Sequence, residues 1–133
     1  PGLDRAALAR LYENLGRIPQ ALNLYESALQ QGDLPPIHFA QTLHRYARIF
    51  KRRGDWQTAA DLWSRAADLG DAEACIELAK YCEHQLRHPG EAIIWTQRAL
   101  QAGIPTHWTP AQCRDFDSEI HKRLARLKRL LAP

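Results

Sequence analysis

The chain has 133 residues, of which 45% are hydrophobic and 25% are charged, and its formal net charge is +3. This composition is that of one ordinary globular domain with enough apolar residues to bury a core. No apolar run approaches the roughly eighteen residues of a membrane helix, and no charged-then-apolar segment suggests a signal peptide. Because the chain begins at Pro1 and contains no Met, we expect it to be a fragment of a longer protein. Its three cysteines are an odd number without metal spacing, which favours a reducing cytoplasm over a disulfide framework.

One pattern of turn, helix and glycine stop occurs three times along the chain. The clearest copy spans residues 54–71, and similar copies span 16–32 and 90–103. Ala21, Ala59 and Ala92 hold equivalent positions in these copies, separated by 38 and 33 residues. Repetition at this period indicates two-helix units that stack and bury one another's apolar faces. We therefore expect a helical repeat array.

The pattern predicts seven helices and no strand. The first helix is expected to begin after an N-cap at Asp4, and Gly16 should end it. Its predicted apolar face consists of Leu8, Leu11, Tyr12 and Leu15. The second helix follows Pro19 and stops at Gly32, and the third covers about 37–53.

The remaining helices follow the same alternation of turn and apolar stripe. They lie within the copy at 54–71, at about 72–84 and at about 89–102. Thr109 and Pro110 should start the last helix as N-cap and first-turn residue. Its apolar residues recur every three or four positions, at Phe116, Ile120, Leu124, Leu127 and Leu131. Such a one-sided helix is what the end of a repeat stack needs as a cap.

Two sets of small and aromatic residues resemble the signature of the tetratricopeptide repeat. They are Ala9, Tyr12, Gly16, Ala21, Tyr25, Ala28 and Leu29, and then Ala47, Phe50, Gly54, Ala59, Trp63 and Ala66. The connection at 66–74 is similar to that of the related Sel1-like repeats. In the third repeat one extra residue precedes Ala92. Its aromatic residue, Trp95, lies three residues after the alanine, where Tyr25 and Trp63 lie four residues after theirs. The resemblance implies a right-handed α-solenoid with repeats at about 4–32, 36–70 and 72–103, a capping helix at about 109–131, and one domain over 1–133.

In tetratricopeptide arrays the first helix of each pair lines a concave groove. The positions that the resemblance places there are Arg10, Glu13, Asn14, Gln41, His44, Arg45, Arg48, Arg52, Glu77, Lys80 and His84. The middle of this groove would be positive and would suit an acidic peptide, a C-terminal carboxylate or a phosphate. The chain departs from the set that holds chaperone tails, because Ala6 and Glu77 stand where basic or amide residues are needed. We therefore expect a different partner.

Basic residues form two clusters, one at 45–53 and one at 121–129. A possible basic patch in the second cluster consists of Lys122, Arg123, Arg126 and Arg129. Long basic side chains also serve simply to solvate helix faces and to complement helix C-termini. Either interpretation fits the sequence.

Residues suited to catalysis are scarce. Cys75 and Cys82 lie seven residues apart, with His84 and His88 close by, but no Cys-x-x-Cys pair accompanies them. Both fall on an apolar helix face, where cysteine packs as a small hydrophobe. The chain has no phosphate-binding glycine loop, no nucleophile elbow and no paired carboxylate motif. We expect no enzyme activity and no cofactor.

A second resemblance covers residues 77–88, 90–92 and 123–127. These segments are similar to the repeat region that closes some bacterial proteins with an RNase H-like exonuclease domain. That resemblance implies a non-catalytic module whose enzyme lies upstream. We weigh two functions: a scaffold that binds a protein or peptide, including an anionic one, in its groove, or an accessory domain that holds nucleic acid through clusters 45–53 and 121–129. Binding to phosphates should weaken steeply with salt, which separates the two.

Overall fold

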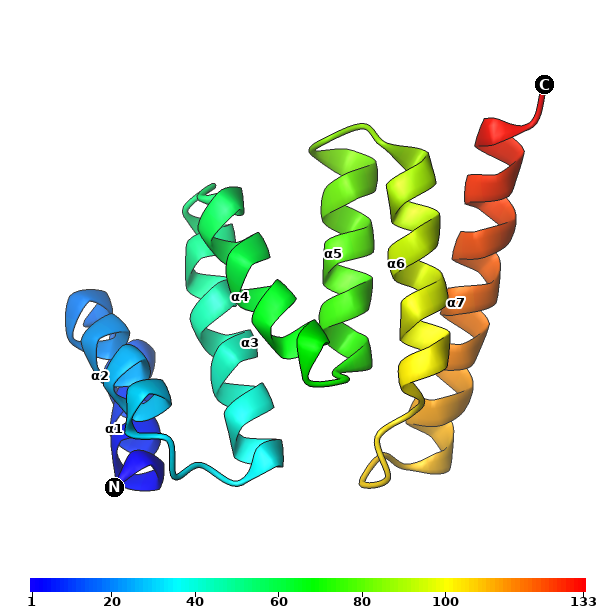
Figure 1. Ribbon diagram of the computed structural model, residues 1–133. Helices are drawn as coiled ribbons and strands as arrows, with labels where there is room; N and C mark the ends of the chain where they lie inside the picture. Colours follow the sequence, from blue (N-terminus) through cyan, green and yellow to red (C-terminus); the bar gives the residue numbers. More distant parts are fainter. The chain divides into compact units, whose positions relative to one another are not determined.

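The computed structural model describes residues 1–133 and is entirely α-helical (Figure 1). The helices are α1 (Gly2–Asn14), α2 (Ile18–Gln31), α3 (Pro36–Arg52), α4 (Trp56–Asp68), α5 (Ala72–His84), α6 (Pro89–Ala102) and α7 (Pro110–Leu131). The predictions of seven helices, no strand and the all-α class are confirmed. None of these helices is both long and apolar enough to cross a membrane.

The chain divides into two compact units, Pro1–Leu62 and Trp63–Pro133, with the boundary inside α4. The single domain over 1–133 and the right-handed course of the repeats remain predictions. Tyr25, Trp63 and Ala92, which the repeat signature places between helices, are all buried.

In the first unit, α1 and α2 form a hairpin that packs through small residues. Ala9 and Ala21 are fully buried together with Tyr25, and Ile49 of α3 completes this cluster. Of the predicted apolar face of α1, only Tyr12 packs against this cluster, and the prediction was wrong for Leu8, Leu11 and Leu15, which are 42%, 54% and 62% exposed. The buried face carries Gly2, Ala6 and Ala9 instead, because side chains of this size let two helix backbones approach closely.

The start of α1 also differs from the prediction, since the helix begins at Gly2 and not after Asp4. The Gly2 N–H donates a hydrogen bond of 2.9 Å to Asp33 Oδ1. A Cβ atom on Gly2 would lie only 2.4 Å from that oxygen. Arg5 adds bonds of 2.7 Å to Ser27 Oγ and 2.9 Å to Gln31 Oε1. The end of α2 thus fixes the first turn, and Asp4 lies within it, where an acid complements the helix dipole.

The same turn closes α1, α3 and α4. Gly16, Gly54 and Gly70 have φ values of 76°, 77° and 85°, which L side chains rarely adopt. After each glycine, a backbone N–H reaches back to a carbonyl of the last helical turn, from Arg17 to Tyr12 at 2.9 Å, for example, and from Asp55 to Phe50 at 2.9 Å. These bonds satisfy carbonyls that a helix end leaves free. The repeated glycine stop is therefore a repeated structural unit.

In the second unit, α6 packs against both α5 and α7. Cys82, Ala92 and Leu127, one from each helix, form a buried cluster with Ile93 and Trp95 at its edge. The third repeat turns differently, because Arg87 takes the positive φ of 57° that glycine has in the others. This turn contains the extra residue that the sequence showed before Ala92.

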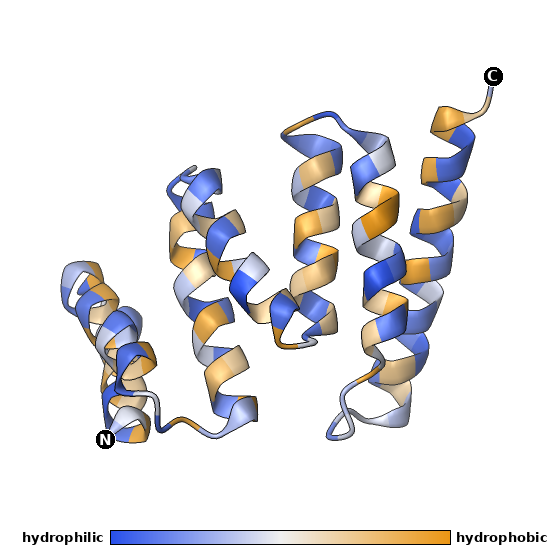
Figure 2. Ribbon diagram, viewed as in Figure 1, coloured by the Kyte–Doolittle hydropathy of each residue, from blue (hydrophilic) through white to orange (hydrophobic).

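Asp71 and Thr109 set the starts of α5 and α7. Asp71 Oδ1 accepts the N–H of Ala74 at 2.9 Å, and Thr109 exchanges bonds of 2.8 and 3.1 Å with Gln112 in a capping box. Ile120 and Leu127 of the predicted α7 stripe are buried, but Leu131 is exposed. Figure 2 shows hydrophobic and hydrophilic residues side by side along this helix, as a one-sided apolar stripe requires.

Candidate partner-binding hollow

A hollow of about 170 Å³ lies between α1 and α3 in the first unit. Eight residues line it: Leu3, Ala6, Ala7 and Arg10 from α1, and His38, Gln41, Thr42 and Arg45 from α3. We refer to this feature as the hollow. It is smaller than the roughly 300–1,000 Å³ of a typical small-molecule site. The volume instead suits one side chain of a longer partner.

The hollow has an apolar part and a positively charged part. Leu3, Ala6 and Ala7 make one part apolar, whereas Arg10 and Arg45 contribute two permanent positive charges. The Arg45 guanidinium also interacts with the Tyr25 hydroxyl of α2. Such a surface offers van der Waals contact and charge-assisted hydrogen bonds to the same small group.

Polar contacts of the Tyr25 hydroxyl connect residues of α1, α2 and α3. The Tyr25 hydroxyl donates a hydrogen bond of 2.5 Å to Glu13 Oε1. Burial raises the pKa of Tyr25 well above its usual range, and the bond to the Glu13 carboxylate adds to this effect. The Arg45 guanidinium, which also interacts with the hydroxyl, lowers the pKa in part. Glu13 and Arg45, which lies on the hollow, thus share the Tyr25 hydroxyl as a partner.

Three of the predicted groove residues, Arg10, Gln41 and Arg45, line the hollow together. Asn14, Arg48 and Arg52 are exposed on the same helices outside it, and His44 is half-buried. Lys80 and His84 lie on α5 in the second unit. Lys80 Nζ lies 3.6 Å from Glu77 Oε1, and His84 Nε2 lies 3.8 Å from Glu83 Oε2. A binding role for these residues remains a prediction.

Sequence reasoning missed five of the lining residues as contributors to a site: Leu3, Ala6, Ala7, His38 and Thr42. A helix-face signal was present for all five, since Ala6 and Ala7 lie four and three residues before Arg10 and Thr42 lies three before Arg45. Leu3 and His38 lie seven residues before Arg10 and Arg45, and seven residues are two helical turns. Each therefore shares a helix face with a predicted groove arginine.

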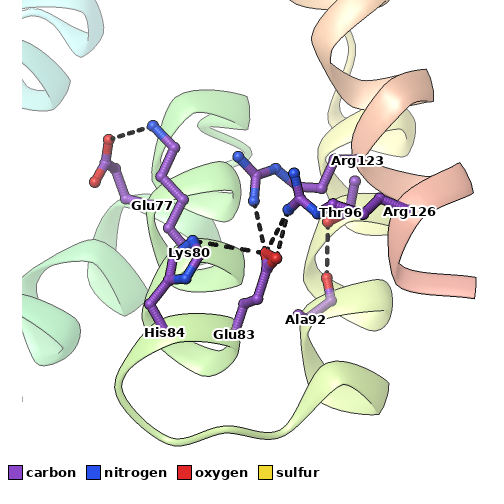
Figure 3. A network of polar contacts seen from close by, with 8 residues as sticks. All are labelled: Glu77, Lys80, Glu83, His84, Ala92, Thr96, Arg123 and Arg126. Carbon is purple, nitrogen blue, oxygen red and sulfur yellow. Dashed lines mark hydrogen bonds and ion pairs between the residues drawn. The ribbon is translucent and has the colours of Figure 1, made fainter. Parts of the chain in front are cut away.

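The basic patch predicted on α7 is partly occupied by an internal ion cluster (Figure 3). Glu83 of α5 accepts a hydrogen bond of 3.1 Å from Arg123 and bonds of 2.5 and 2.6 Å from Arg126. The Glu83 side chain is 9% exposed and that of Arg123 is 14% exposed. Lys122 and Arg129 remain exposed without such a partner. Arg123 and Arg126 thus hold α7 to α5.

Cys75 and Cys82 lie in the core of the second unit. Burial raises the pKa of both thiols, so they are protonated at neutral pH. A buried neutral thiol is a poor nucleophile and a poor metal ligand. Their placement agrees with the packing role that the apolar face predicts.

Comparison with known families gives one match. The family model described as tetratricopeptide repeat matches residues 5–36, which cover most of α1 and all of α2. No curated protein matches the chain. The predicted resemblance to tetratricopeptide repeats is therefore confirmed for the first hairpin. Such repeats are generally non-catalytic modules for protein–protein interaction.

Proposed function

We propose that the chain is a non-catalytic interaction module of the cytoplasm that binds an anionic segment of a partner protein in the hollow. The observation that carries this proposal is the combination of two guanidinium groups with an apolar surface in a space the size of one side chain. Peptide recognition commonly uses such a pair of features, since the apolar part supplies affinity and the charged part supplies specificity. The exposed Asn14, Arg48 and Arg52 would extend contact along α1 and α3.

Arg10→Ala is expected to weaken partner binding about tenfold, the effect of losing one charge-assisted hydrogen bond. The probe is an acetylated, amidated pentapeptide of alanine and leucine with one central glutamate, called here the glutamate peptide. Fluorescence anisotropy of its labelled form measures the Kd. Arg114→Ala is the matched control, because Arg114 is exposed on α7 and does not line the hollow. Equal affinities for the two variants would contradict the proposal.

The alternative function, an accessory domain that binds nucleic acid for a bacterial exonuclease, has less support. Glu83 engages two of the four residues of the predicted α7 patch, which leaves Lys122 and Arg129. The same assay with a labelled single-stranded oligonucleotide tests it. Tight binding that falls about a thousandfold between low and physiological salt would favour this alternative over the peptide.

A further inference from the structure

α1 has apolar residues on two sides, and the fold covers only one of them. Gly2, Ala6 and Ala9 are buried within the first unit. A second set of apolar residues, spaced by three and four positions along one side of the helix, is exposed to solvent. We refer to this set as the leucine stripe, and it consists of Leu8, Leu11 and Leu15. An apolar patch of this kind is typical of a surface that binds another molecule.

The last helix shows what a solvated outer face looks like in the same chain. α7 buries Ile120 and Leu127 on one side, and Arg114, Lys122 and Arg129 are exposed on the other. A charged face of this kind gains nothing from being covered. The leucine stripe, in contrast, removes apolar surface from water when a second surface covers it.

We propose that the leucine stripe joins two copies of the chain through an antiparallel contact between their α1 helices. The steps of three and four residues are those of the seam along which two helices pack in a coiled coil. A two-fold axis near Leu11 brings Leu8 of each copy against Leu15 of the other. The stripe is therefore complementary to itself in this orientation.

The charges at the two ends of the stripe favour a second copy as the occupant. Asp4 lies one helical turn before Leu8, Arg17 follows two residues after Leu15, and both are exposed. Antiparallel pairing places Asp4 of each copy at the end where the other copy has Arg17, whereas parallel pairing would bring like charges together. Arg5, the other charge beside Asp4, is held by Ser27 and Gln31 of α2. The contact uses no lining residue of the hollow and does not rest on the function proposed above.

The size of the stripe determines how tight the dimer should be. Three leucines and two exposed ion pairs make a contact smaller than the roughly 800 Å² per partner of a standard interface, so we expect a Kd on the order of 10–100 μM. Sedimentation velocity of the full chain, from about 5 to about 500 μM, measures it. The sedimenting mass should rise from that of the 15.2 kDa monomer towards twice that value. A monomer at every concentration, or growth beyond the dimer, would overturn the proposal.

Leu11→Glu places two like charges near the two-fold axis and is expected to weaken the dimer at least tenfold. Leu131→Glu is the matched control, because Leu131 of α7 is 53% exposed and Leu11 is 54% exposed. Leu11→Ser is a second variant that adds no charge, and it should also weaken the dimer. Far-UV circular dichroism checks that each variant is folded. If Leu131→Glu weakens association as much as Leu11→Glu does, the assignment to α1 is wrong.

A charge exchange tests the antiparallel orientation. Asp4→Lys and Arg17→Glu should each weaken the dimer about fivefold, because each variant sets like charges against one another at both ends of the contact. The double variant restores opposite charges and should return the Kd to within about twofold of the wild-type value. If the double variant associates no more tightly than the single variants, the two helices do not pair in this orientation and the proposal is overturned.

Discussion

Tyr25→Ala is expected to lower the free energy of unfolding by about 4 kcal/mol, within the range for removing a large aromatic side chain from a core. Tyr25 is fully buried and packs with Ala9, Ala21 and Ile49. Its ring also lies 6.0 Å from that of Tyr46, measured between centroids. The alanine side chain would leave a cavity in the centre of this cluster. Urea denaturation followed by far-UV circular dichroism measures the loss.

Tyr25→Phe distinguishes the contribution of the hydroxyl to stability from that of the ring. This change keeps the packing of the ring and removes the hydroxyl that donates to Glu13 and interacts with Arg45, so the expected loss is about 1–2 kcal/mol. The difference between the two variants reports what the ring contributes. A loss below about 1 kcal/mol for Tyr25→Ala would mean that this core does not depend on the aromatic side chain, contrary to the packing described above.

The second large effect concerns the ion cluster that joins α5 and α7 (Figure 3). Glu83→Ala should destabilise the protein by about 3 kcal/mol, since removing one partner of a buried ion pair strands the other charge. Arg123 would be left largely buried without a carboxylate. Denaturation measures the size of the loss, and amide hydrogen exchange should show that protection falls most in α7.

Two other variants calibrate this result. Arg126 is 45% exposed, so water replaces much of its interaction, and Arg126→Ala should cost about 1 kcal/mol or less. Glu119→Ala removes an exposed acid from α7 and should have almost no effect. If Glu83→Ala lowers the free energy of unfolding no more than Glu119→Ala does, the ion cluster does not stabilise the fold.

The helices could be predicted from the sequence because their ends are coded locally. A glycine with positive φ, an Asp or Thr cap and a first-turn proline each act within one helical turn. The face of α1 could not be predicted in the same way. Leu8, Leu11 and Leu15 form a more hydrophobic stripe than Ala6 and Ala9, yet the alanines are buried. Hydrophobicity alone does not reveal where two helices approach so closely that only small residues fit.

The site was predictable to a similar degree. Family resemblance pointed to Arg10, Gln41 and Arg45 as neighbours, and they do line one hollow. The apolar surface beside them depends on how α1 lies against α3, which no local pattern encodes. Glu83 lies 40 and 43 residues from Arg123 and Arg126. The basic cluster at 121–129 therefore did not show which of its residues form ion pairs within the folded chain.

The most direct test of the proposed function is a titration of isotope-labelled protein with the glutamate peptide, followed by NMR chemical shifts. The account predicts that the largest shifts fall on backbone amides around the hollow, at Ala7, Arg10, Gln41 and Arg45, while those of α7 remain unchanged. No shift at these four residues, or the largest shifts between Lys122 and Arg129, would contradict it.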